Sequence, residues 1–308
     1  MARRGASRQT PPQRQATLID AHGHVNWYGY DAGRLVANMD QHGIAVMWLL
    51  SWDVPEDEVD DGTKGVLWPG QSGMPLRETL DAVAQFPDRF VPFYAPDPRK
   101  RGAVERLAAA VKYHGVRGCG ELKCRIMLDD PRALELFHFC GEAKLPVIFH
   151  MDVPLPRRAL GRDPGYWYCC DWENLARALE LCPRTIFLGH APGFWREISG
   201  GADASPQQYP EGPVKPGGRL WKYLRRYPNL YCDLSANSAL RALRRDPHVG
   251  RRLLTSYCER CLFGRDFFDG ALLDFLRSCA LPRRCWECIT RENALRLVPL
   301  QGGRPRPG

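Results

Sequence analysis

Two histidines that lie two residues apart, His22 and His24, end an apolar run near the start of the chain. Residues at this spacing on a β-strand point to the same side, so both imidazoles can face one point, with Gly23 leaving room between them. Neutral imidazole is a common ligand of divalent metals, although histidines also serve as ordinary hydrogen-bonding groups. The pair therefore indicates a metal site without establishing one.

Three further apolar runs end in compatible side chains, His150, His190 and Asp266. Imidazoles combined with one carboxylate suit Zn²⁺, Fe²⁺, Mn²⁺ or Co²⁺ better than Ca²⁺ or Mg²⁺, which prefer oxygen ligands. We expect one divalent ion, most simply Zn²⁺, with a second ion as the alternative.

Glu121 and Lys123 end another apolar run and are again two residues apart. A carboxylate beside a divalent cation stays ionised and coordinates readily, which makes Glu121 a candidate ligand. The alternatives are a Glu121–Lys123 ion pair or a contact from Lys123 to a substrate carboxylate. Trp27 and Arg125 follow strand ends and are further candidate substrate contacts, because rings and cations suit a small organic acid. Packing between loops would use the same rings.

Eight apolar runs rich in β-branched and aromatic residues carry these groups, and we interpret them as strands. They cover residues 17–25, 46–53, 90–96, 115–123, 146–152, 185–191, 230–236 and 261–267. Helical patterns alternate with them, after Pro75, Pro131 and Asp171 and at 32–42, 101–113, 219–227, 238–257, 270–280 and 291–297. This α/β alternation predicts a (β/α)₈ TIM barrel, in which reactive groups lie at the carboxyl ends of the strands.

The length of 308 residues and the hydrophobic content of 44% favour one catalytic domain over residues 17–298. Residues 1–16 form an expected disordered basic tail, and 299–308 an expected flexible tail. The net charge is +8, but these tails hold six arginines, which leaves only +2 for the body: Arg3, Arg4, Arg8, Arg14, Arg304 and Arg306. Nucleic-acid binding is therefore disfavoured.

No apolar run is long enough to span a membrane, and no secretory signal pattern is present, so we expect a cytoplasmic protein that does not bind membranes. The sequence leaves a homo-oligomer possible. Twelve cysteines are then expected as reduced thiols. The pairs Cys258-x-x-Cys261 and Cys285-x-x-Cys288 leave a structural zinc site as an alternative, although Cys261 opens an expected strand.

Several of these motifs together resemble the amidohydrolase superfamily. They are IDAHGH at 19–24, the spaced His150 and His190, FGRD at 263–266 and ENALRL at 292–297. The closer resemblance, over about residues 17–298, is to its amidohydrolase-related branch, which includes aminocarboxymuconate-semialdehyde decarboxylase, related decarboxylases and lactone hydrolases. Branch members often have a serine before the last aspartate and a proline soon after it. Here Arg265 precedes Asp266 and Phe267 follows, so substrate contacts are expected to differ.

The resemblance implies that His22, His24, His150 and Asp266 ligate the metal, with His190 beside the water that reacts. Asp266 is the expected proton acceptor, and His190 would orient the water or stabilise an oxyanion. A divalent ion would activate that water and polarise a carbonyl.

The first functional prediction is a metal-dependent hydrolase of a small amide, ester or lactone, with an organic acid derivative as substrate. The alternative is a lyase, namely a metal-dependent non-oxidative decarboxylase of an aromatic or unsaturated carboxylic acid. A TatD-like nuclease, of which the Gly120-Glu121 pair is reminiscent, ranks third because the body carries little positive charge. A non-catalytic metal-binding protein is the remaining class.

Overall fold

The computed structural model describes residues 18–53, 58, 73–153 and 167–300. The tail expected at 1–16 and residues 301–308 lie outside this part of the chain. The strands are β1 (Leu18–Gly23), β2 (Ile44–Leu49), β3 (Phe90–Pro92), β4 (Cys119–Leu122), β5 (Val147–His150), β6 (Phe187–His190), β7 (Leu230–Asp233) and β8 (Cys261–Leu262). Each lies within an expected strand or overlaps it.

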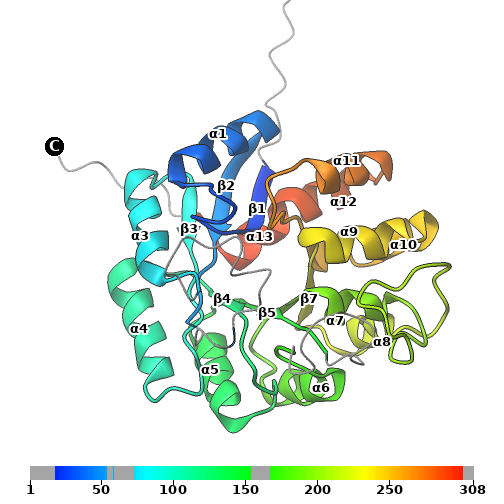
Figure 1. Cartoon of the computed structure of the whole chain (residues 1–308), viewed down its shortest axis with the longest axis horizontal. Helices are drawn as coiled ribbons and strands as arrows, with labels where there is room; N and C mark the ends of the chain where they lie inside the picture. The colour runs from blue at the N-terminus through cyan, green and yellow to red at the C-terminus, as the bar shows by residue number, and fades with distance from the viewer. Residues whose placement is uncertain (1–17, 54–57, 59–72, 154–166, 301–308) are drawn as a thin grey trace, which may run out of the picture.

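Helices surround these strands (Figure 1). They are α1 (Ala32–His42), α3 (Leu76–Gln85), α4 (Ala103–His114), α5 (Pro131–Glu142), α6 (Trp172–Leu181), α7 (Pro192–Trp195), α8 (Arg219–Arg226), α9 (Ala236–Arg244), α10 (Pro247–Ser256), α11 (Ala271–Ser278), α12 (Arg283–Glu287) and α13 (Asn293–Leu297), with a π-helical turn at Cys288–Glu292. None of the described helices is long and apolar enough to cross a membrane.

The strands pair in parallel and in chain order, β1 to β3 and β4 to β8. Backbone hydrogen bonds join these sets into a ring. The amide of Tyr94, after β3, donates to Gly118 O before β4 at 3.1 Å, and that of Ala21 in β1 donates to Phe263 O after β8 at 2.9 Å. The chain is therefore a (β/α)₈ TIM barrel, as the alternating pattern predicted.

Apolar side chains from six of the strands pack with one another, which is the arrangement of a filled barrel interior. This cluster contains Ile19, Ala21, Val46, Trp48, Leu50, Val91, Phe93, Ile148, Leu188 and Leu262, together with Ala294 and Val298 near the C-terminus. A second, larger cluster packs the outer helices against the barrel. Strands buried on both sides explain why the expected strands read as continuous apolar runs.

A buried ion pair ties β1 to the segment that follows β8. Arg265 Nε lies 2.7 Å from Asp20 Oδ2, the Arg265 amide donates to Asp20 Oδ1 at 3.0 Å, and Arg265 Nη1 donates to Asn38 in α1 at 2.8 Å. Burial raises the pKa of Asp20 even though Arg265 opposes it. The pair fixes the backbone directly before Asp266.

The prediction of a single helix over 238–257 is wrong, because the structure has two helices there, α9 and α10. Proline cannot continue a helix, and Pro247 begins the second one. Asp246 caps that helix by accepting hydrogen bonds from the amides of His248 and Val249, both at 3.1 Å. The Asp-Pro pair was the sequence signal for this break.

All twelve cysteines are described, and each has a free thiol. The alternative of a zinc site at the two Cys-x-x-Cys pairs finds no support. Within the described residues, the groups close enough to hold a metal lie elsewhere. The thiol of Cys261 interacts with that of Cys232 on the neighbouring strand.

Candidate metal centre

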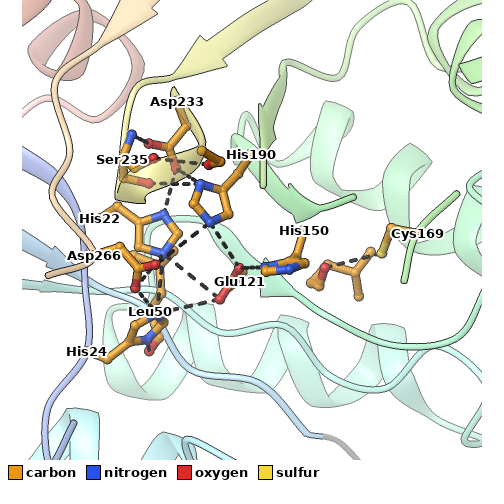
Figure 2. Close-up of polar contacts among 12 residues, drawn as sticks. His22, His24, Leu50, Glu121, His150, Cys169, His190, Asp233, Ser235 and Asp266 are labelled. Atoms are coloured by element: carbon orange, nitrogen blue, oxygen red, sulfur yellow. Dashed lines mark hydrogen bonds and ion pairs between the residues drawn. The ribbon is translucent and has the colours of Figure 1, made fainter. Parts of the chain in front are cut away.

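His22 in β1 and His24 directly after it, called the β1 histidines below, meet an aspartate that follows β8 (Figure 2). His22 Nε2 lies 3.2 Å from His24 Nε2. Asp266 Oδ1 is 3.7 Å from the first of these nitrogens and 3.5 Å from the second. Both histidines are fully buried, and the Asp266 side chain is 14% exposed. Three of the expected ligands thus surround one point.

Glu121 and His190 lie on the other side of that point. Glu121 Oε2 is 3.5 Å from His24 Nε2 and 3.9 Å from His22 Nε2. Its Oε1 is 3.6 Å from His190 Nε2, which is 3.9 Å from Asp266 Oδ2. Two overlapping groups can hold a metal, with ligand atoms within 4.8 Å of one another: His22, His24 and Asp266; and His22, Glu121 and His190.

His150, the fifth expected ligand, lies beside these groups and belongs to neither. Its Nδ1 is 2.5 Å from Glu121 Oε1, and its Nε2 is 2.9 Å from Asp152 Oδ2. Both ring nitrogens therefore face carboxylates. In this arrangement His150 contacts the centre through Glu121.

The far sides of the two β1 histidines are held by hydrogen-bond acceptors. His22 Nδ1 donates to Asp233 Oδ2 at 2.6 Å, and His24 Nδ1 donates to Leu50 O at 2.9 Å. Outer partners of this kind orient a metal-binding imidazole, because a proton on Nδ1 leaves the Nε2 lone pair free. Sequence reasoning missed Asp233, although it is a carboxylate at the end of the expected strand 230–236, which is the signal that identified Asp266.

The donor set is that of a divalent metal site: imidazole nitrogens and carboxylate oxygens gathered at the carboxyl ends of barrel strands. Residues 19–300 match the amidohydrolase family. The chain belongs to this family. The resemblance noted in the sequence is thereby confirmed.

Solved structures similar to this amidohydrolase share its fold at low sequence identity. An uncharacterized TIM-barrel protein from Bordetella bronchiseptica is 15% identical, with a TM-score of 0.63 over 92% of this chain and 98% of that one. A dihydroxybenzoic acid decarboxylase from Polaromonas, with bound manganese and 2-nitroresorcinol, is 20% identical, with a TM-score of 0.57 over 92% and 97%. A protein assigned as a 2-pyrone-4,6-dicarboxylic acid hydrolase from Pseudomonas putida is 17% identical, with a TM-score of 0.58 over 92% and 97%. No curated protein matches the sequence.

The buried carboxylates of the amidohydrolase centre attract positive charge. Burial would lower the pKa of His22, but Asp233, Asp266 and Glu121 outweigh it and raise that pKa to about 10. Burial would raise the pKa of Asp266, but His22 and then His24 outweigh it and lower that pKa to about 2. The aspartate is therefore ionised, and the site favours a cation, whether a proton or a metal ion.

The pKa values of the two remaining groups, Glu121 and His190, are both lowered. Burial would raise the pKa of Glu121, yet His150 and the β1 histidines hold it well below its ordinary value. Burial, followed by the nearby charge of His22, lowers the pKa of His190 to about 4. At neutral pH Glu121 is thus ionised and His190 neutral.

Aromatic rings and one lysine border the centre. The ring of Trp27 is 5.7 Å and that of Trp52 is 5.4 Å from the His24 ring. Lys123 Nζ lies 5.8 Å from the Trp52 ring and 5.4 Å from the Tyr168 ring. Trp52 was not singled out in the sequence, because it fell inside the expected strand 46–53. The amine of Lys123 thus lies among the rings on this side of the centre.

Arg125, the other expected substrate contact, is tied to Glu58 through its backbone. Its amide donates to Glu58 Oε2 at 3.0 Å. Its Nε is buried and has no hydrogen-bond partner in the described part of the chain. No described contact joins its guanidinium to the metal centre.

Proposed function

We propose that this amidohydrolase is a metal-dependent hydrolase, acting with water on a small amide, ester or lactone that carries an acid group. The observation that carries the proposal is the set of buried, ionised carboxylates around imidazoles whose Nε2 atoms face one point. A divalent cation is the partner that such a group stabilises best.

His22, His24, Asp266 and Glu121 would hold the ion, with His150 acting through Glu121. Zn²⁺ is the simplest occupant of a site with two imidazoles and two carboxylates, and Mn²⁺ also suits it. Bound there, the ion would activate water near neutral pH and polarise a carbonyl. A single ion accounts for the geometry, because both possible groups share His22.

The side chains divide the remaining work. Asp266 accepts the proton of the attacking water, since its low pKa keeps it ionised and its side chain is the most exposed of the carboxylates facing the ligand histidines. His190 hydrogen-bonds the oxygen on which negative charge develops. Lys123 pairs with the substrate carboxylate, and Trp27 and Trp52 pack against its apolar part.

A decarboxylase is the second candidate, and the structural similarity to a dihydroxybenzoic acid decarboxylase favours it. The same centre could hold a carboxylic acid substrate while a proton is delivered to the carbon that loses CO₂. The two reactions differ in the fate of the water oxygen, which only hydrolysis transfers to product.

The test starts from metal-free protein reloaded with Zn²⁺ or Mn²⁺, with metal content measured by mass spectrometry. Lactones, esters, amides and aromatic carboxylic acids are then screened in ¹⁸O-labelled water. We expect turnover in the first three classes with ¹⁸O in the product. His190→Asn should lose most activity and keep its metal, whereas His248→Asn, an exposed control on α10, should keep both. Turnover confined to carboxylic acids, with CO₂ released, would establish the decarboxylase instead.

A further inference from the structure

We propose that Asp233 and Ser235, at the end of β7, are positioning residues that fix opposite tautomers of two histidines. Asp233 keeps a proton on His22 Nδ1, so that Nε2 is the atom that binds a metal ion, and Ser235 makes His190 present an N–H. The inference rests on the proposed metal-dependent function and separates a ligand from a hydrogen-bond donor within it.

Asp233 determines the tautomer of His22. The Asp233 side chain is fully buried, and its Oδ2 lies 2.6 Å from His22 Nδ1. Its Oδ1 accepts the amide of Ser235 at 2.9 Å, which holds the carboxylate in place. An ionised carboxylate only accepts hydrogen bonds, so Nδ1 must carry the proton. Nε2 is then the nitrogen of His22 that faces the centre, and the one from which a metal ion would displace a proton.

Ser235 acts on His190 in the opposite sense. Its Oγ is 2.9 Å from His190 Nδ1, and both residues are buried (Figure 2). In the described chain this hydroxyl makes no other hydrogen bond, so its proton would be left unsatisfied if Nδ1 were the donor. Asp233 Oδ2 lies 3.6 Å from the same nitrogen, beyond hydrogen-bond distance. Ser235 therefore donates, and the proton of His190 is on Nε2.

The inward side of His190 agrees with this assignment. Its Nε2 faces two acceptors, Glu121 Oε1 at 3.6 Å and Asp266 Oδ2 at 3.9 Å. An N–H at this position can interact with these carboxylates in the resting site and can donate a hydrogen bond to a developing oxyanion during the reaction. His190 would then be no ligand in the working site, although its nitrogen lies close enough to a possible metal position.

Gly264, two residues after β8, leaves room for Asp233 at the end of β7 to contact His22 in β1. A Cβ placed on Gly264 would lie 2.9 Å from His22 Cβ, 3.0 Å from Asp233 Oδ1 and 3.2 Å from Ser235 Cβ. A side chain at this position would separate these three residues. The contact between Asp233 and His22 thus depends on the absence of a side chain between them.

The Ser235 half is tested by NMR on metal-free, ¹⁵N-histidine-labelled protein at neutral pH, with the signals of His190 assigned through His190→Asn. We expect His190 as the Nε2–H tautomer in the wild type and in Ser235→Thr, and a shift toward Nδ1–H in Ser235→Ala. Ser238→Ala is the matched control, because among the described residues this buried hydroxyl hydrogen-bonds the backbone carbonyl of Ser235 and not a histidine. An Nδ1–H tautomer in the wild type would overturn this half.

The Asp233 half is tested by zinc affinity in competition with a chelator. Asp233→Asn should bind zinc about 10- to 100-fold more weakly, because its amide can donate to Nδ1 and turn the proton of His22 inward. Its His190 tautomer should stay unchanged, which excludes general disruption. Unchanged zinc affinity in Asp233→Asn would refute this half. Should that variant fail to fold, Gly264→Ala tests the same contact from β8, with the same expected loss of affinity.

Failure of the proposed function would give a different set of results from failure of the tautomer assignments. A wild type that binds no metal at all would refute the metal-dependent function and the ligand role of His22. The tautomer of His190 is read without metal and would still be decided. Ser235→Ala should keep the zinc affinity of the wild type and lose turnover, whereas Asp233→Asn should lose both.

Discussion

His150 donates a hydrogen bond from Nδ1 to Glu121 Oε1 over 2.5 Å. Its second nitrogen faces Asp152, so an imidazole lies between two carboxylates at the edge of the metal centre. Burial would lower the pKa of His150, but Glu121 outweighs it and raises that pKa to about 9. At neutral pH the ring is an imidazolium, which holds Glu121 in place beside the β1 histidines.

Paired substitutions of these residues show which of them binds the ion. Glu121→Gln should weaken zinc binding about 10- to 100-fold, because it removes the charge that faces His24. His150→Gln should retain one zinc per chain with affinity reduced about tenfold, since it acts through Glu121. Mass spectrometry of both variants after dialysis measures this. Complete loss of zinc in His150→Gln would show that the ring leaves Glu121 and binds the ion directly.

The barrel closure predicts a second measurable effect. Arg265→Met leaves the charge of Asp20 buried without its partner, so the free energy of unfolding should fall by about 3–5 kcal/mol. Asp20→Asn combined with Arg265→Met removes both charges and should cost less than Arg265→Met alone. Denaturant unfolding of the single and double variants measures the difference. Additive losses would mean that the two residues stabilise the barrel independently.

The sequence predicted which strand ends carry the site residues, but not how each side chain is oriented there. Strand ends of a parallel barrel meet on one side, so the spacing of His22, His24 and Asp266 sufficed to predict that they lie close together. The orientation of His150 could not be predicted, because a ring at a strand end can turn toward a metal or toward a neighbouring carboxylate. That choice depends on Asp152, two residues further along, and on Glu121, which comes from the neighbouring strand β4.

Two omissions had different causes. Asp233 ended an expected strand and could have been included by the argument used for Asp266. The link between Asp20 and Arg265 was beyond sequence reasoning, because it joins the first strand to the last and depends on the closure of the ring. The Asp246-Pro247 break was readable from local rules and was overlooked within a long amphipathic pattern.

Stability at acid pH should depend on Asp97. Burial would raise the pKa of this carboxyl, but the hydrogen bonds from Arg99 outweigh it and lower the pKa below the ordinary value of 3.8. A lowered pKa in the folded state stabilises the protein above pH 3.8, and this contribution is lost as the pH falls below that value toward the folded pKa. Asp97→Asn should therefore destabilise by about 1–3 kcal/mol at neutral pH and progressively less in acid.

Thermal unfolding of Asp97→Asn and wild type across this pH range checks the sign. Asp81→Asn, on the exposed face of α3, is the control and should have little effect at any pH. A destabilisation by Asp97→Asn that stays constant down to strongly acid pH would show that packing, and not the charge, is what Asp97 contributes.

Lys123 should control which substrates this amidohydrolase accepts. Its amine lies among the rings of Trp52 and Tyr168 beside the centre, where a substrate carboxylate would gain a charge-assisted hydrogen bond. Lys123→Met should raise KM for acid-bearing substrates about 10- to 100-fold, as expected for loss of one such bond, and leave zinc content unchanged. Steady-state kinetics on matched pairs of acid and methyl ester measure this, with Lys112→Met on α4 as the control. An equal rise in KM for the acid and for its ester would show that Lys123 contributes to the reaction or to folding. It would exclude a specific contact between Lys123 and the substrate carboxylate.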